Sequence, residues 1–341
     1  MTITTIGLDL AKNVFQVHGV DGNGEVVVRR QLRRNAVLPF FSDLPSCLVG
    51  LEACGSSHHW ARELKRMGHD VRLMPPHYVK PYVKRSKNDA ADAEAICEAV
   101  SRPSMRFVPL KGEEQQSVLM LHRTRNLLVR QRTMLVNALR SHLSEFGVVV
   151  AKGIENISKL ATIVESNEKG HLPTAAVTAL TMIIDQLRDL NTRIDILEKE
   201  IVRRHRKNPE SKRLATIPGI GPITASALSA TITDASQFKS GRQLAAWLGL
   251  VPRQNSSGGK ERLDRISKQG DKYLRQLLVI GATSMLGVVR KKRTPDDEWV
   301  IALLDKKPPR LVTVALANKM ARIAWAVMSR QEIYKTRQTH I

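Results

Sequence analysis

Short apolar runs separated by turn residues open the chain. Residues 3–8 and 14–17 read as strands, and Glu25-Val26-Val27-Val28 opens a third strand beyond the glycine-rich turn at 21–24. This spacing is typical of strands joined by tight connections, so we expect a three-stranded meander at the start of the chain.

Strand and helix patterns then alternate as far as residue 100. The runs at 47–51 and 70–74 are short and largely apolar, which is typical of buried strands. A helix is expected from Ser56 or Ser57 to Met67, and a second one from Ala90 to Val100. A meander followed by this alternation predicts an α/β domain with a mixed sheet over residues 1–110.

Between residues 111 and 207 the pattern of apolar and polar residues changes to one that predicts long helices. Apolar residues recur every seven positions at Leu180, Leu187, Ile194 and Ile201. The positions three residues before them hold Val177, Ile184, Asn191 and Glu198. This is a coiled-coil seam, and an earlier leucine-rich stretch interrupted by Arg125 and Arg132 predicts an antiparallel partner helix. A dimerising coiled coil and an ordinary helical bundle both remain open.

The last segment, residues 208–341, is basic and punctuated by glycine, and we expect an all-α domain there. Charge is the strongest compositional feature of the whole chain. With 54 Lys and Arg against 32 Asp and Glu, the formal net charge is +22. Such an excess indicates a polyanionic partner, although ribosomal and membrane-surface proteins share it. Aromatic residues are only 4% of the chain, which excludes a single-strand binder that lays bases on successive rings.

Membrane insertion and disulfide bonding are not expected. The chain has no apolar run of about 20 residues and no signal-peptide pattern, so we expect a cytoplasmic protein that does not enter the membrane. Cys47, Cys54 and Cys97 are odd in number and lack the spacing of a zinc site.

Four carboxylates form the first candidate site. Asp9 ends the first strand, Glu52 ends the apolar run at 47–51, and Asp89 and Asp92 lie three residues apart at the start of a helix. Each acid alone is better explained as a turn, surface or helix-start residue. Together they form a cluster that needs cations, and oxygen-only ligands select Mg²⁺ or Mn²⁺. Two such ions can hold the attacking and leaving oxygens of a phosphodiester substitution.

A glycine-rich turn forms the second candidate site. Its proposed phosphate-binding residues are Pro218, Gly219, Gly221 and Thr224. The Pro-Gly-Ile-Gly sequence resembles a helix-hairpin-helix motif, in which backbone N–H groups at a helix start bind a DNA phosphate. A tight interhelical turn without a ligand is the alternative.

A serine-containing loop forms the third. Ser256 and Ser257 precede Gly258-Gly259, and the surrounding cations are Arg253, Lys260, Arg262, Arg265 and Lys268. A serine among cations can attack a phosphodiester, because the positive charge stabilises both the alkoxide and the transition state. From these residues alone, a solvated loop is the stronger explanation.

The residues of these sites and of several other segments resemble those of one protein family. The matching positions are 6–12, 51–55, 87–93, 217–221, Phe238, 245–250, 252–253, 257–258, 265–270 and 318–322. These segments occur in the same order, and over almost the whole chain, as in the DEDD transposases of insertion-sequence family one-ten, which they resemble. Their residues are most similar to those of its branch eleven-eleven.

The resemblance implies more than the residues do. It implies a RuvC-like N-terminal domain of the ribonuclease H fold, with Asp9, Glu52, Asp89 and Asp92 as metal ligands. It also implies that Ser257 forms a 5′-phosphoserine link to double-stranded DNA, where only its spacing from Pro252-Arg253 favours it over Ser256. Members of the family act as homo-oligomers assembled through a coiled coil, and a structured non-coding RNA guides them.

Two other functions compete with an RNA-guided recombinase. A junction resolvase would use the same acids with water as the nucleophile and form no covalent intermediate. A non-catalytic nucleic-acid-binding scaffold would account for the charge and the coiled coil, but it would leave the four acids unexplained.

Overall fold

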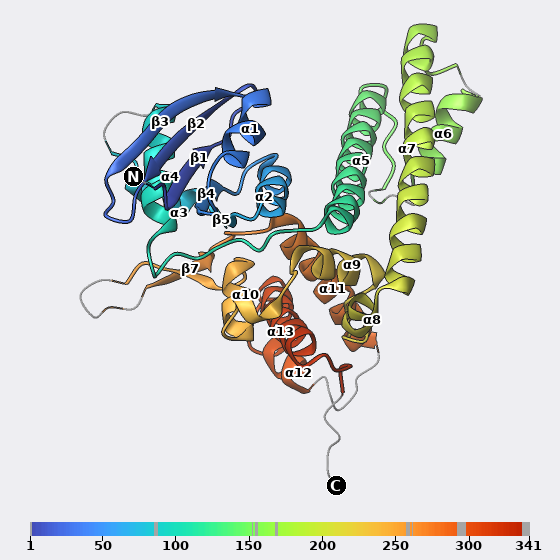
Figure 1. The fold of residues 1–341 in the computed structure, drawn as a ribbon. Coiled ribbons are helices and arrows are strands. Elements are labelled where there is room, and N and C mark those ends of the chain that lie inside the picture. The colour runs from blue at the N-terminus through green and yellow to red at the C-terminus, as the bar shows by residue number, and fades with distance from the viewer. Residues whose placement is uncertain are drawn as a thin grey trace. The chain divides into compact units, whose positions relative to one another are not determined.

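The computed structural model describes residues 2–84, 88–151, 153, 156–167, 170–256, 260, 262–291 and 298–335. Contacts divide the chain into two compact units, Met1–Gly112 and Glu113–Ile341 (Figure 1). The second unit contains both the helical segment and the basic segment that the sequence separates at residue 207.

A five-stranded mixed sheet forms the centre of the first unit. Its strands are β1 (Thr5–Asp9), β2 (Val14–Val20), β3 (Val26–Arg33), β4 (Leu48–Glu52) and β5 (Asp70–Met74). The order is β3-β2-β1-β4-β5; the pairs β3–β2 and β2–β1 are antiparallel, and the pairs β1–β4 and β4–β5 are parallel. The predicted meander and mixed sheet are therefore confirmed.

Helices cover both faces of this sheet. They are α1 (Val37–Ser42), α2 (Ser57–Arg66), α3 (Pro76–Val79) and α4 (Asp89–Val100), with short 3₁₀ turns at Arg34–Ala36 and Lys80–Tyr82. Ile6 and Leu8 of β1 pack with Trp60 of α2 in one apolar cluster. The alternate residue Gly7 points to the opposite face, where α4 lies. The central strands β1 and β4 are buried on both sides, whereas most residues of β3 are exposed or only partly buried.

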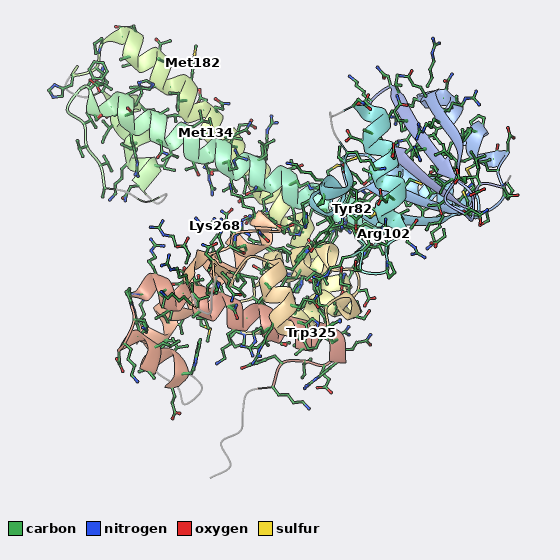
Figure 2. The ribbon with its side chains drawn as sticks, turned by 90° about the vertical axis from the view of Figure 1, so that its left-hand side faces the viewer. Tyr82, Arg102, Met134, Met182, Lys268 and Trp325 are labelled. Carbon is green, nitrogen blue, oxygen red and sulfur yellow. The ribbon has the colours of Figure 1, made fainter. Side chains whose placement is uncertain are left out.

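A helical hairpin begins the second unit. Helix α5 (Glu113–Ser144) packs against α7 (Thr174–Lys207), and the shorter α6 (Ile157–Ser166) completes their apolar cluster. The seven-residue pattern is used inside the chain, because Leu180 and Leu187 are buried in the cluster that Leu139 of α5 joins. Met134 and Met182 lie on the exposed faces of the two helices (Figure 2).

Polar residues along the hairpin are matched across it. The Arg125 guanidinium donates to the Glu198 carboxylate, with Nε at 2.8 Å from Oε1. Nη1 of Arg132 donates to Oδ1 of Asn191 at 3.1 Å. The two arginines that interrupt the leucine spacing of α5 therefore face the two polar seam positions of α7.

The remaining helices share one large core. They are α8 (Pro209–Leu214), α9 (Pro222–Thr231), α10 (Gly241–Trp247), α11 (Lys272–Lys291), α12 (Glu298–Leu304) and α13 (Pro309–Arg330), with a 3₁₀ turn at Ala235–Gln237. Among the described helices, α13 is the one that is long and apolar enough to cross a membrane. Half of its most apolar stretch is buried in the unit, as in a core helix.

The expectation of an all-α C-terminal domain is wrong at one place. Strands β6 (Pro252–Gln254) and β7 (Leu263–Ile266) form an antiparallel hairpin between α10 and α11. Every residue of the pair is exposed except the partly buried Ile266, so no alternation of buried and exposed positions marks these strands in the sequence.

Candidate active site

Two acids leave the sheet at the same edge. Asp9 is the last residue of β1 and Glu52 is the last residue of β4, and these strands run parallel with Leu8 opposite Leu51. Neighbouring parallel strands end at the same edge of a sheet, so their terminal side chains emerge together.

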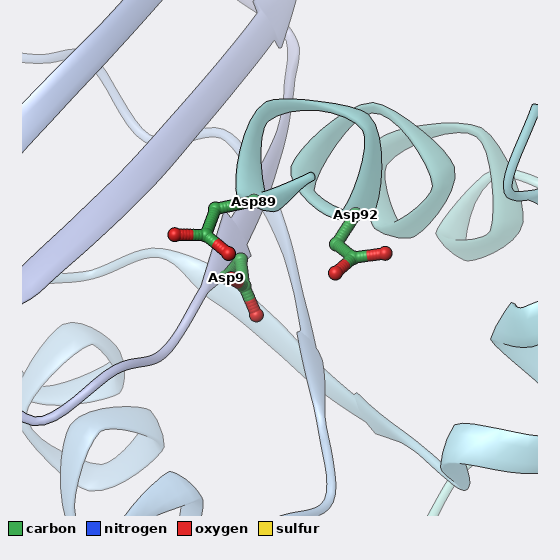
Figure 3. Close-up of side chains that lie close together, drawn as sticks. All are labelled: Asp9, Asp89 and Asp92. Carbon is green, nitrogen blue, oxygen red and sulfur yellow. The ribbon is translucent and has the colours of Figure 1, made fainter. Parts of the chain in front are cut away.

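The start of α4 brings two more acids to this edge. Asn88 caps the helix, and its Oδ1 accepts a hydrogen bond from the N–H of Ala91 at 2.8 Å. Asp89 and Asp92 follow in the first turn. One ligand oxygen from each of Asp9, Asp89 and Asp92 lies within 4.8 Å of the others (Figure 3). Three of the four predicted acids therefore converge.

Glu52 is not among these three carboxylates, although it ends the strand next to that of Asp9. The pKa of the nearby Cys54 thiol is raised, first by burial and then by the negative charges of Glu52 and Asp9. Both carboxylates therefore act on one thiol at this end of the sheet, but only the three aspartates converge.

Two glycines allow α4 to approach the sheet, and the sequence analysis missed them. A Cβ at Gly7 would lie 2.1 Å from the Ala93 carbonyl oxygen, and one at Gly50 would lie 2.8 Å from the Cβ of Val100. Gly7 and Gly50 are paired across β1 and β4. A repeated pattern could have revealed them, because each glycine stands two residues before a strand-ending acid.

A row of polar side chains extends from Asp9 across the sheet. Asp9 is opposite Gln16 of β2, and Gln16 is opposite Gln31 of β3, so all three point to the face that α4 covers. A cavity of about 420 Å³ adjoins Gln16, Gln31 and Asn88. The four acids do not line this cavity themselves, but Gln16 is the strand partner of Asp9 and Asn88 precedes Asp89 in the sequence.

The donor set fits a hard divalent cation. Mg²⁺ holds oxygen ligands at about 2.0–2.1 Å, so opposite ligands of one ion lie about 4.2 Å apart. Carboxylate oxygens within 4.8 Å of one another need only small side-chain rotations to reach that spacing. Asp9, Asp89 and Asp92 are thus able to hold such an ion.

The Pro-Gly-Ile-Gly turn joins α8 to α9. Gly219 has a φ of +83°, and Gly221 is the residue before the first turn of α9. Pro218 and Gly221 are exposed, whereas Thr224 is buried. A Cβ on Gly281 of α11 would lie 2.0 Å from the Gly219 carbonyl oxygen, so the turn packs directly on that helix.

The β6–β7 hairpin carries the serine loop. Ser257 lies outside the described residues. Ser256 is exposed, and its Oγ accepts a hydrogen bond from the N–H of Arg262 at 3.2 Å. All five predicted basic residues of this region are exposed: Arg253, Lys260, Arg262, Arg265 and Lys268.

Comparison with known proteins gives two matching family models. A model described as a transposase, of the DEDD type, matches residues 6–148. A second, described as the transposase IS116/IS110/IS902 family, matches residues 211–296. The first model covers all four acids, and the second covers the glycine turn and the serine loop.

Similar proteins extend over the whole chain. A probable family 20 transposase of Pseudomonas aeruginosa is 52% identical over 98% of this chain and 99% of its own length. The transposase for insertion sequence element IS1111A of Coxiella burnetii is 40% identical over 98% of this chain and 92% of its own length. A pilin gene-inverting protein of Moraxella bovis is 23% identical over 99% of both chains.

Proposed function

The chain belongs to the IS116/IS110/IS902 family of transposases, enzymes that cut and rejoin DNA, and we propose that it does so with a serine nucleophile under the guidance of an RNA. The observation that carries the metal-dependent cutting of DNA is the convergence of Asp9, Asp89 and Asp92 at the edge of the sheet, and the serine and the RNA rest on the family resemblance. Such a cluster is unfavourable without cations, and oxygen ligands suit those that assist phosphoryl transfer.

Asp9, Glu52, Asp89 and Asp92 would hold Mg²⁺ or Mn²⁺. When bound, these ions neutralise the charge that develops on the phosphate oxygens during substitution. The protein's own part is positional, because Gly7 and Gly50 let α4 lie close to β1 and β4. The glutamines beside Asp9 would contact the strand that enters the site.

Ser257 would supply the nucleophile. Its Oγ attacks the phosphorus and forms an O–P bond, while the bond from phosphorus to the 3′ oxygen breaks and that oxygen takes up the serine proton. The product is a 5′-phosphoserine link and a free 3′-hydroxyl. Because the ester keeps the energy of the broken bond, a second 3′-hydroxyl can displace the serine and reseal the DNA without another energy source.

The loop's surroundings support this role. The cations at Arg253, Lys260, Arg262, Arg265 and Lys268 would stabilise the serine alkoxide and the phosphate in the transition state. The backbone N–H groups of Gly219, Gly221 and Thr224 would bind a DNA phosphate at the start of α9, while Pro218, which has no N–H, would hold the shape of the turn.

RNA guidance and assembly rest on the resemblance and on the charge. A formal charge of +22 favours binding of a structured guide RNA in addition to double-stranded DNA. A homo-oligomer would bring several sets of these residues to the two ends of the element. The relative named for inverting a pilin gene is consistent with breakage followed by rejoining.

Trapping of the covalent intermediate tests the serine mechanism. The protein, loaded with its guide RNA, is mixed with 5′- or 3′-labelled target DNA and Mg²⁺, and the reaction is stopped with detergent. We expect DNA attached to wild-type protein through a 5′ end. Ser257→Ala should give no adduct and no recombinant, and it should still bind both nucleic acids.

Ser256→Ala is the matched control, because it removes the same hydroxyl from the neighbouring position. It should retain most of the adduct. Cleavage by Ser257→Ala at the wild-type rate with free 5′-phosphate ends would make water the nucleophile, as in a junction resolvase. Loss of the adduct only in Ser256→Ala would move the nucleophile by one residue.

A further inference from the structure

A large groove opens on the second unit, away from the glycine turn. We call it the C-terminal groove; its volume is about 1550 Å³. One face of α13 lines it with apolar side chains, including Leu311, Val314, Ala315, Ile323 and Ala326. The β6–β7 hairpin lines it as well, through Pro252, Arg265 and Ile266. The groove therefore borders the hairpin that carries the serine loop.

Cationic side chains line the groove as well. They are Arg242, Arg265, Lys268, Arg310, Lys319 and Arg322, and Asp264 is the only acid among the described lining residues. None of these six cations makes an ion pair with any residue that the structure describes. Lys319 lies over the Trp299 ring instead, with Nζ 4.5 Å from the ring centroid. The charge around the groove thus favours a polyanion.

Two of the four tryptophans of the chain line the groove, although aromatic residues are rare in this protein. Trp299 is 41% exposed. Trp325 is partly buried and held in place, because its Nε1 donates to the carbonyl oxygens of Ala235 and Phe238 at 3.2 and 3.1 Å. Figure 2 marks Trp325 and Lys268 on this unit. An apolar lining with aromatic rings offers a surface to the flat face of a base.

Duplex DNA would not use such a lining. In a duplex the base faces are stacked on one another, and the backbone presents phosphates and sugars to a protein. A groove lined by both apolar and cationic side chains suits nucleotides whose bases are unstacked, because bases can then lie on the aromatic and aliphatic side chains while phosphates meet the arginines.

The apolar part of the lining favours deoxyribose over ribose. A ribose hydroxyl buried against aliphatic side chains would need a hydrogen-bond partner. Asn318, the amide side chain of the lining, already uses one of its two N–H groups to donate to the Leu250 carbonyl oxygen at 3.1 Å. The hydrogen atoms of deoxyribose and the methyl group of thymine need no such partner.

We propose that the C-terminal groove binds unpaired nucleotides of a DNA strand, with at least one base against Trp299. The placement of these nucleotides next to the serine loop rests on the proposed function. The binding itself does not, because it requires neither cleavage nor the carboxylates.

A direct test uses fluorescein-labelled oligodeoxythymidylate of 20 nucleotides and a duplex of equal length, with binding followed by anisotropy on the full chain. Loss of one base–aromatic contact costs about 1–3 kcal/mol, which is roughly a 5- to 150-fold rise in Kd. We expect Trp299→Leu to weaken binding of the single strand by about tenfold or more and to leave duplex binding within about twofold.

Trp247→Leu is the matched control. Trp247 belongs to the same unit and is 40% exposed, nearly the same as Trp299, but it does not line the groove. It should bind the single strand as the wild type does. Circular dichroism of both variants checks that the fold is retained.

Three outcomes would overturn the proposal. Equal weakening by Trp299→Leu and Trp247→Leu would show that the groove plays no special part. Tighter binding of oligouridylate than of oligodeoxythymidylate, lost in Trp299→Leu, would make RNA the occupant. A Leu311→Glu variant that changes the mass of the assembly in light scattering while binding the single strand normally would make the groove a protein interface. None of these results depends on whether Ser257 forms an adduct.

Discussion

The α5–α7 hairpin and the C-terminal groove are both rich in arginine, but they treat its charge in opposite ways. Ion pairs hold Arg125 to Glu198, Arg188 to Glu165, and Arg204 to Glu114 and Glu200 in the hairpin region. Around the groove, Arg242, Arg265, Arg310 and Arg322 have no carboxylate partner among the described residues.

This difference distinguishes arginines that stabilise the fold from arginines that are available to bind a ligand. A paired guanidinium presents little net charge to a distant phosphate, because its carboxylate partner cancels the field. An arginine without such a partner keeps its full charge for a polyanion. Of the excess of +22, the arginines without a carboxylate partner should therefore contribute most to binding. Substitutions should distinguish these arginines from the paired ones.

The carboxylate cluster is acidic where the groove is basic. A substitution in this cluster should give the largest effect on activity. Asp9→Asn keeps the volume of the side chain but removes a charge that would hold a divalent cation. We expect DNA cleavage in Mg²⁺ to fall by about 10³-fold or more, with thermal unfolding almost unchanged. A single-turnover cleavage assay measures the loss.

Asp70→Asn is a suitable control, since Asp70 is an exposed acid of the same sheet that pairs with Arg72. It should cleave at nearly the wild-type rate. Full activity of Asp9→Asn in the presence of EDTA would remove the carboxylates from the mechanism.

The hairpin seam should give the next largest effect, on stability. Leu187 is 1% exposed in the cluster that α5, α6 and α7 share. Leu187→Asp buries an unpaired carboxylate and removes apolar contacts, so the free energy of unfolding should fall by about 4 kcal/mol or more. Urea denaturation of this variant and of Met182→Asp gives the comparison, since Met182 is on the same helix and 68% exposed. Equal loss in both variants would mean that the seam is not a core.

How much of this arrangement the sequence predicts depends on whether a contact is local. The strands of the sheet and the acids that end them follow from short apolar runs, and parallel neighbours necessarily end at one edge. The pairing of Arg125 with Glu198 joins residues 73 positions apart, and only the register of the hairpin brings them together.

The same limit applies to close approaches. Gly7 and Gly50 matter because a helix more than 40 residues later lies on them, and neither strand pattern contains that information. Strands β6 and β7 were missed because almost all their side chains are exposed, so burial leaves no alternating pattern to read. The role proposed for Ser257 rests on the resemblance to a family alone, because neither the local pattern nor the described residues indicate it.

A buried histidine joins the hairpin to the basic helices, and it should make stability depend on pH. His122 lies 3.1 Å from both the Tyr273 hydroxyl and the Ser226 hydroxyl. Burial, followed by the charge of Arg125, lowers the pKa of His122 from 6.5 to about 4. The unfolded chain therefore binds a proton between pH 6.5 and 4 that the folded chain does not, so the stability falls as pH falls through this window.

The histidine should contribute about 3 kcal/mol of that loss between pH 7 and pH 4. His122→Gln keeps a polar side chain but cannot titrate, so the difference between its stability and that of the wild type should narrow as the pH falls. Urea denaturation at several pH values measures this difference. A difference that stays constant with pH would contradict a buried neutral His122.

The smallest expected effect tests the comparison most directly. Arg125 has only 20% of its side chain exposed and Glu198 has 38%, so removing one partner strands a partly desolvated charge. Arg125→Leu should lower the free energy of unfolding by about 1–2 kcal/mol, and a double-mutant cycle with Glu198→Leu should recover about 1 kcal/mol as coupling.

Arg322→Leu removes an exposed arginine that has no such partner, so it should change stability by less than about 0.5 kcal/mol. Its effect should appear in binding instead, where the slope of log Kd against log salt for single-stranded DNA drops by about one unit. If Arg125→Leu changed that slope and Arg322→Leu changed stability, the division between structural and binding arginines would be reversed.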